Sequence, residues 1–133
     1  MKEKNKFEQA FQVALKARKF AYAPYSKFQV GAALILENDE IISGCNVENA
    51  SYGGTVCAER SAIFSAISQG KRKFQSMVLV TDPLAVPCGL CLQVMAEFFS
   101  PKTKIYICDL QGVKKEIEFK DLLPHTFGPD SLK

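Results

Sequence analysis

The sequence has no long apolar segment and no leader of the secretory type. None of its hydrophobic runs approaches the ~20 residues that a membrane-spanning helix needs. Its first nine residues, MKEKNKFEQ, lack the apolar core of a signal peptide. We therefore expect a cytoplasmic protein that has no membrane partner.

A continuous basic stripe is also missing. The formal net charge is only +3, and the lysines and arginines behind it are scattered in short groups along the chain. Nucleic-acid-binding surfaces typically concentrate basic residues on one face and interleave them with aromatic residues. We expect no nucleic-acid partner.

Internal repeats, low-complexity segments and linkers are absent as well, so we expect a single domain over residues 1–133. A domain of this length, 47% hydrophobic, buries roughly two-thirds of its unfolded surface and does not need disulfides in order to fold. The cysteines number five, which is odd, and a reducing compartment disfavours their pairing. Their spacing must indicate what they do.

Apolar periodicity predicts an alternation of helices and strands. Asn5 and Glu8 resemble a capping box for the first helix, and Gly70 is placed to end the second. The last two strands are too close in sequence for a helical crossover, so they should be antiparallel. We expect a three-layer α/β/α fold around a mixed five-stranded sheet, with helices near 7–15, 56–69 and 88–99 and strands near 28–36, 40–47, 77–80, 104–108 and 113–119.

Two short cysteine motifs begin predicted helices: Cys57-Ala58-Glu59 and Pro87-Cys88-Gly89-Leu90-Cys91. A helix N-terminus presents free backbone N–H groups and the positive end of the helix dipole, and both favour the thiolate form of cysteine. Three thiolates gathered there could hold zinc tetrahedrally and leave the fourth position open. An open position is where a catalytic water belongs.

The motifs also allow other interpretations. A redox protein would need only Cys88 and Cys91, which leaves Cys57 and Glu59 without a role. A closed structural zinc site needs a fourth ligand, and the single histidine, His125, lies in the C-terminal tail. Cys45 or Cys108 could supply that ligand, although both lie in predicted strands, where a free cysteine usually packs as a small buried hydrophobe.

The combination of Cys-Ala-Glu with Pro-Cys-x-x-Cys matches the signature of the zinc deaminases. Further matching segments are APYSKF at 23–28, NVENASYG at 46–53, and LLP at 122–124 followed by Phe127-Gly128. Together they resemble the short, homotetrameric cytidine deaminases from one end of the chain to the other. The resemblance implies zinc-dependent hydrolysis of cytidine and deoxycytidine to uridine and deoxyuridine, with release of ammonia, in pyrimidine salvage.

The resemblance also implies roles for the matching residues. Zinc would be the cofactor and a nucleoside the small-molecule substrate, and the protein would be a homotetramer whose Phe127 completes a neighbour's pocket. Without the resemblance, the polar pair Asn46 and Glu48 would be interpreted as a solvent-facing strand end, and Tyr52 either as a loop anchor or as part of the pocket wall. The implied assignments are zinc ligation by Cys57, Cys88 and Cys91; general acid/base catalysis by Glu59; hydrogen bonds to ligand sulfurs from Arg60; ribose binding by Asn46 and Glu48; stacking near the base by Phe28; and substrate contacts from Val47, Tyr52, Ala58 and Phe127.

The second cysteine segment departs from the family pattern P-C-G-A-C-R-Q. Leu92 stands where that pattern has arginine, which leaves every ligand in place but changes the charge near the metal site. Three other possibilities remain. A blasticidin-type deaminase should lack Asn46-Val47-Glu48, and a polynucleotide deaminase usually has histidine as its first ligand. A non-enzymatic zinc-binding module would have four protein ligands.

Overall fold

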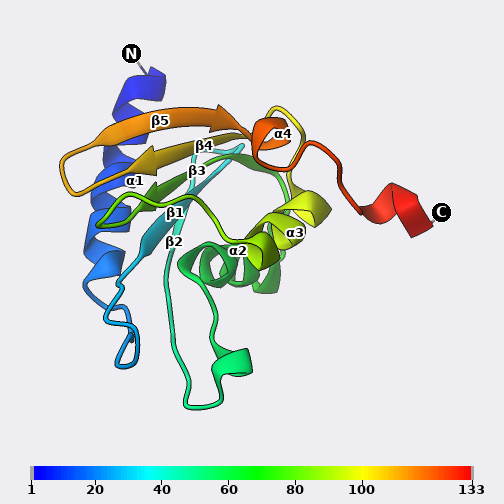
Figure 1. Cartoon of the computed structure of the whole chain (residues 1–133). Coiled ribbons are helices and arrows are strands. Elements are labelled where there is room, and N and C mark those ends of the chain that lie inside the picture. Colours follow the sequence, from blue (N-terminus) through cyan, green and yellow to red (C-terminus); the bar gives the residue numbers. More distant parts are fainter. Residues whose placement is uncertain (1, 133) are drawn as a thin grey trace.

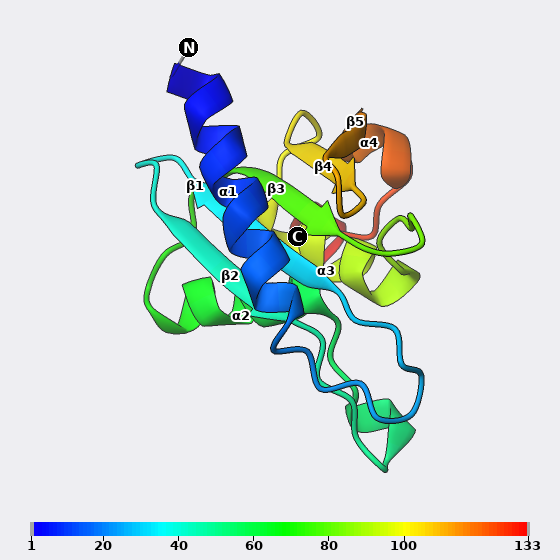
Figure 2. The same cartoon turned by 90° about the vertical axis from the view of Figure 1, so that its left-hand side faces the viewer.

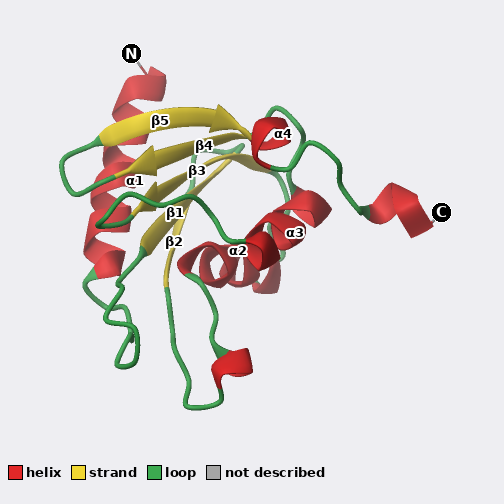
Figure 3. Ribbon diagram, viewed as in Figure 1, coloured by secondary structure: helices red, strands yellow, loops and turns green. Residues whose placement is uncertain are grey.

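A computed structural model describes residues 2–132 and shows a sheet covered by helices on both faces (Figure 1). Helix α1 lies on one face, and α2 and α3 lie together on the other (Figure 3). The predicted three-layer α/β/α fold is therefore confirmed. The elements are α1 (Lys2–Arg18), β1 (Gly31–Leu36), β2 (Ile41–Cys45), η1 (Tyr52–Gly54), α2 (Ala58–Ser68), β3 (Phe74–Val80), α3 (Gly89–Phe98), β4 (Lys104–Cys108), β5 (Val113–Glu118), α4 (Phe119–Leu122) and η2 (Pro129–Leu132).

The five strands form one mixed sheet in the order β2-β1-β3-β4-β5. Hairpins join β1 to β2 and β4 to β5, both antiparallel, as the short connections predicted. Only β3 and β4 are parallel, and α3 supplies the crossover that a parallel pair requires. This crossover brings the start of α3 to the same end of the sheet as the end of β3.

Helix α1 lies across one face of the sheet (Figure 2), and small residues on both surfaces allow close packing. Its buried stripe of Ala10, Phe11 and Ala14 meets alternate residues of β1 and β3. At Gly31 on β1, a Cβ atom would lie 2.0 Å from the carbonyl oxygen of Ala14. A side chain at this position would therefore force α1 away from the sheet.

The opposite face of the sheet packs against α2 and α3. Met77 and Leu79 of β3 point to this side, whereas Val78 and Val80 point towards α1. Because both faces of β3 are covered, the strand is apolar almost throughout and does not alternate. The same layer buries Ala58, at the start of α2, and so fixes where the first cysteine motif lies.

Several predicted boundaries were wrong. Helix α1 begins at Lys2, so Asn5 lies inside it and is not its N-cap; lysine and glutamate favour helix and extend it towards the N-terminus. Strand β1 begins at Gly31, not at Phe28, because the Asn46 side chain takes the hydrogen bonds of this segment that a neighbouring strand would otherwise make.

The predicted end of α2 is confirmed. Gly70 has a left-handed φ of 79°, its N–H donates to the carbonyl oxygen of Ile67 (2.9 Å), and Lys71 donates to Ala66 (3.0 Å). This pair of bonds is the Schellman arrangement that glycine favours. None of the described helices is both long and apolar enough to cross a membrane.

Candidate metal and catalytic site

Three cysteine sulfurs converge where α2 and α3 begin. The Sγ atoms of Cys57, Cys88 and Cys91 all lie within 4.8 Å of one another, at 3.7 Å between Cys57 and Cys88 and 3.6 Å between Cys88 and Cys91. A tetrahedral zinc ion with Zn–S bonds of about 2.3 Å places its sulfur ligands about 3.8 Å apart. The sulfurs therefore have the chemistry and the spacing that zinc requires.

The fold brings these sulfurs together through two helix N-termini. Cys57 is the N-cap of α2 and Cys88 the N-cap of α3, both with extended backbone, and neither side chain is used to cap its own helix. Cys91 follows one turn into α3, on the same side as Cys88. The positive ends of both helix dipoles therefore face the cluster and favour negative charge on it.

Hydrogen bonds within the cluster favour a thiolate at Cys57. The pKa of Cys57 is lowered because the Cys91 thiol, Arg60 and Cys88 all interact with its sulfur. The Arg60 Nη2 atom lies 3.6 Å from that sulfur and 3.4 Å from the carbonyl oxygen of Thr55. Conversely, the pKa of Cys91 is raised, first by its hydrogen bond to Cys57 and then by burial.

Glu59 lies in the first turn of α2, beside the sulfurs. Its side chain is only 4% exposed, and burial, with a further contribution from the negative charge of Cys57, raises the pKa of Glu59 to about 7. Within the described residues, the group close enough to share one metal ion consists of the three sulfurs alone. The Glu59 carboxyl group is thus placed to exchange protons near neutral pH without being a ligand.

A cavity of about 210 Å³ opens directly onto this cluster. Cys57, Cys88 and Glu59 lie in its wall together with three of the residues predicted to hold the substrate. Those three are Phe28, Asn46 and Glu48.

Asn46 and Glu48 hold the backbone around the cavity as well as lining it. The Asn46 side chain, 7% exposed, accepts a hydrogen bond from the N–H of Val30 (2.9 Å) and donates one to the carbonyl oxygen of Phe28 (2.7 Å). Oε1 of Glu48 accepts from the backbone N–H groups of Tyr25 (3.0 Å) and Ser26 (3.1 Å). The interpretation as a solvent-facing residue is therefore wrong for Asn46, which is buried, whereas Glu48 is partly exposed.

Four other predicted substrate residues do not line this cavity within the described chain. Val47 bridges Tyr22 and Val56 through its backbone, and its side chain points outward. Ala58 is fully buried at the start of α2. Tyr52 and Phe127 are 76% and 60% exposed, on η1 and in the C-terminal segment respectively.

Sequence reasoning missed other residues of the cavity wall. Ser26 lies inside the segment APYSKF, which carried part of the resemblance, so its motif was a usable signal. Thr81 is 2% exposed, and its Oγ1 accepts a hydrogen bond from the N–H of Ala85 (2.9 Å). No local pattern marks Thr81, because its position in the wall follows from where β3 ends.

The two remaining cysteines are not near the cluster. Cys108 is fully buried at the end of β4 in the layer below α1, as its predicted packing role requires. Cys45 is half-buried and lines a groove beside α1. Neither supplies a fourth ligand, so the site is not a closed four-cysteine site.

Leu92 fits its surroundings without a charged partner. Its side chain packs against the apolar core beneath α2 and α3. Arg60 is the cation that contacts a ligand sulfur in this structure.

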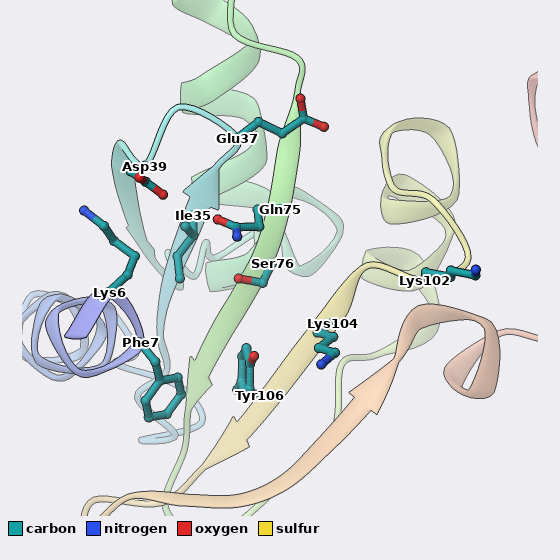
Figure 4. Close-up of a pocket in the computed structure, with 10 residues that line it drawn as sticks. All are labelled: Lys6, Phe7, Ile35, Glu37, Asp39, Gln75, Ser76, Lys102, Lys104 and Tyr106. Atoms are coloured by element: carbon teal, nitrogen blue, oxygen red, sulfur yellow. The ribbon is translucent and has the colours of Figure 1, made fainter. Parts of the chain in front are cut away.

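A larger cavity, about 470 Å³, lies between α1 and the far end of the sheet (Figure 4). Phe7 of α1 and Tyr106 of β4 face each other there with ring centroids 4.9 Å apart. Its lysines approach from different elements and do not converge on one point (Figure 4). Neither the cysteine cluster nor Glu59 lines it, so the smaller cavity is the one that holds reactive groups.

Comparison with known proteins agrees with this geometry. Residues 4–108 match the family model described as the cytidine and deoxycytidylate deaminase zinc-binding region. The chain belongs to this deaminase family. Members of the family bind zinc, which fits the three sulfurs.

Relatives in the family align over almost their whole length. A cytidine deaminase of Halalkalibacterium halodurans is 48% identical over 121 residues, which are 90% of this chain and 92% of the relative. One from Sporosarcina psychrophila is 47% identical over 88% of each chain. The crystal structure of a cytidine deaminase from Burkholderia pseudomallei superposes with a TM-score of 0.85 at 43% identity and covers 90% of this chain and 98% of that one.

Proposed function

We propose that this chain is a zinc-dependent cytidine deaminase that hydrolyses the 4-amino group of cytidine and deoxycytidine. One observation carries the proposal: a buried carboxyl group, Glu59, lies beside three convergent cysteine sulfurs at the end of a cavity. A general acid/base with a pKa near 7 and a metal site with an open position are the two parts that such a hydrolysis needs.

Cys57, Cys88 and Cys91 would hold the metal. When bound there, zinc would supply Lewis acidity, which makes water acidic enough to provide a nucleophile near neutral pH. Three thiolates outweigh the two positive charges of the ion, so the guanidinium group of Arg60 offsets part of the surplus negative charge.

Glu59 would move every proton of the reaction. Its carboxylate takes a proton from the attacking water and gives it to N3 of the pyrimidine. It then takes the second proton of that water and gives it to the departing amine, which leaves as ammonia. Burial excludes competing water from the carboxyl group and raises its pKa to about 7, so that it can both accept and release protons near neutral pH.

The remaining wall of the cavity would hold the nucleoside. Phe28 would stack near the base, and Asn46 and Glu48 would bind the ribose hydroxyls, because the amide keeps one free N–H and the carboxylate keeps free lone pairs. The charged side chains that line the described cavity, Glu48 and Glu59, are both acidic. This favours a neutral nucleoside over a nucleotide, whose phosphate would be repelled.

Val47, Ala58, Tyr52 and Phe127 remain proposed substrate contacts. Ala58 would contribute through its backbone at the start of α2, and Val47 through its position between Asn46 and Glu48. Exposed Tyr52 and Phe127 would act in an assembly. The carbonyl oxygen of Phe127 accepts a hydrogen bond from Gln93 of α3, and the following helix η2 lies apart from the sheet and its helices (Figure 1).

We further propose a homotetramer in which Phe127 of one subunit completes the pocket of another. Exposed apolar side chains support this proposal: Val86, 54% exposed, lines the cavity, and Leu90, 66% exposed, lies in the first turn of α3 between Cys88 and Cys91. Such surface is typical of an interaction site. The cytoplasm and pyrimidine salvage are the proposed setting of the reaction.

Ammonia and uridine formation from free cytidine tests the function directly. The zinc-loaded protein should convert cytidine and deoxycytidine, and removal of the metal should abolish conversion. Cytidine 5′-phosphate and single-stranded polynucleotides should be poor substrates. Turnover of blasticidin or of polynucleotides without turnover of cytidine would assign the site to another branch of the superfamily, and zinc binding without any turnover would indicate a binding module.

A further inference from the structure

The loop before β1 concentrates hydrogen bonds on one hydroxyl group that the proposed mechanism does not use. Oγ of Ser26 donates to Oε2 of Glu48 and accepts from the backbone N–H of Phe28 (3.0 Å). Ser26 also donates its own N–H to Oε1 of Glu48 (3.1 Å). One side chain therefore touches both the proposed ribose-binding residue and the proposed base-stacking residue.

The backbone between them has an uncommon conformation. Lys27, between Ser26 and Phe28, has a left-handed φ of 62°, which residues with a side chain seldom adopt. Its N–H donates to the carbonyl oxygen of Ala23 (3.0 Å), closing the turn. A turn of this kind persists only where its surroundings hold it, and Ser26 and Glu48 supply those contacts.

The peptide groups of Phe28 are fixed on both sides. Its N–H is held by Ser26, and its carbonyl oxygen by the Asn46 side chain (2.7 Å). Phe28 lies outside β1, so no strand neighbour fixes its backbone. The direction of its ring into the cavity depends on these side-chain contacts.

We infer that Ser26 is a positioning residue whose hydroxyl fixes the Glu48 carboxylate and the Phe28 ring in their positions relative to each other. The inference rests on the proposed function and adds to it a residue that acts through two others. It also accounts for the position of Ser26 in the cavity wall, at a distance in sequence from the zinc site. In agreement, the hydrogen bond from Ser26 is the largest cause of the lowered pKa of Glu48.

Steady-state kinetics on the zinc-loaded protein test the inference. Ser26→Ala should raise the KM for cytidine roughly tenfold, with kcat changed less than about threefold, because a hydrogen bond to a charged group that binds substrate is lost. Ser26→Thr, which keeps the hydroxyl, should stay within about threefold of the original kcat/KM. Ser43→Ala is the matched control, since Ser43 is an exposed serine of β2 outside this cavity.

A double-mutant cycle separates positioning from simple support of the turn. If Ser26 acts partly through Glu48, the Ser26→Ala/Glu48→Gln variant should lose clearly less kcat/KM than the product of the two single losses, and the remaining effect of Ser26→Ala reports on Phe28. Fully multiplicative effects, or an equal loss of kcat and kcat/KM in Ser26→Ala, would overturn the inference.

Zinc content and thermal unfolding are measured on every variant. A further variant, Ser26→Val, matches Ser26→Thr in shape but lacks the hydroxyl. Unfolding or metal loss in both hydroxyl-free variants would assign the hydroxyl to the fold and so overturn the inference. Failure of the unmodified protein and of Ser43→Ala to deaminate cytidine would instead reject the proposed function, and the inference with it.

Discussion

Burial determines what Glu59 can do. A carboxyl group in water is ionised well below neutral pH, but burial raises the pKa of Glu59 to about 7. Glu59 also lies beside Cys57, whose pKa is lowered and whose negative charge raises the pKa of Glu59 further. Its position in sequence, two residues after a cysteine, suggested catalysis, and only the structure shows that it is buried but not among the metal-binding groups.

We therefore expect Glu59→Gln to keep zinc and lose turnover. The amide preserves shape but cannot accept and release protons, so kcat should fall by about 10²–10⁴. Zinc per chain, measured by atomic emission, should match the unmodified protein. Glu97→Gln on the exposed face of α3 is the control, and near-normal turnover in Glu59→Gln would remove Glu59 from the mechanism.

The proposed function divides the five cysteines into three zinc ligands and two residues that do not bind the metal. Cys57→Ala, Cys88→Ala and Cys91→Ala should each lose zinc, because two thiolates do not hold a site that is already open on one side. Cys45→Ala and Cys108→Ala should keep stoichiometric metal, since both lie elsewhere in the fold. A requirement for Cys45 or Cys108 in metal analysis would contradict this division.

At the scale of elements, the site depends on how closely α2 lies on β2. At Gly44 a Cβ atom would lie 2.5 Å from the backbone nitrogen of Ala62 and 2.6 Å from the carbonyl oxygen of Ala58. Both atoms belong to α2, the helix that carries Cys57 at its cap and Glu59 in its first turn. A glycine on one strand thus sets the position of the proposed catalytic carboxyl group, Glu59.

Gly44→Ala should lower the free energy of unfolding by about 1–3 kcal/mol and weaken zinc retention, because α2 must move. Gly31→Ala meets α1 on the opposite face, so it should destabilise the fold without a comparable loss of zinc affinity. Gly53→Ala, where an added Cβ meets nothing within 4 Å, should change neither quantity. Chemical denaturation measures the free energy of unfolding, and competition with a chelator measures the zinc affinity. Equal zinc affinity in the Gly44 and Gly31 variants would contradict a role for Gly44 in positioning the site.

The shifted pKa values of Cys57 and Cys91, at the starts of α2 and α3, also predict how zinc binding varies with pH. The Cys57 pKa is lowered, so that sulfur gives up its proton first, whereas the raised pKa of Cys91 means that zinc must displace a proton there. Zinc affinity should consequently fall as pH falls, by at least about tenfold per unit around neutrality. Calorimetry in buffers of different ionisation enthalpy should detect release of at least one proton per zinc, and a pH-independent affinity would contradict the assignment.

At the scale of the whole molecule, the proposed tetramer predicts that a single chain holds an incomplete pocket. Phe127 is 60% exposed, and the described segment around it is tied to α3 by the hydrogen bond from Nε2 of Gln93 to its carbonyl oxygen (2.8 Å). A phenylalanine so exposed gains an apolar partner by docking on another subunit, where it could stack on the substrate base.

Hybrid tetramers test this arrangement. Glu59→Ala and Phe127→Ala subunits, each inactive alone, should regain part of the activity after mixing, because some pockets then combine an intact Glu59 with an intact Phe127. Light scattering should show a tetramer before and after exchange. No recovery despite verified exchange would mean that Phe127 does not act across an interface.

The sequence by itself determined the local features of this protein. Its apolar periods predicted the three main helices and five strands, and its two cysteine motifs predicted the three sulfurs that the structure brings together. These features depend on neighbours in sequence: helical spacing, a glycine at a helix end, and a cysteine at a helix start.

Tertiary structure decided what depends on distant residues. The burial of Glu59 requires the sheet behind α2, and the withdrawal of Phe28 from β1 requires the Asn46 side chain, 18 residues later. The place of Thr81 in the cavity wall follows likewise from elements that meet only in the fold. Desolvation and side-chain hydrogen bonding arise from three-dimensional packing, so no local pattern in the sequence could have predicted them.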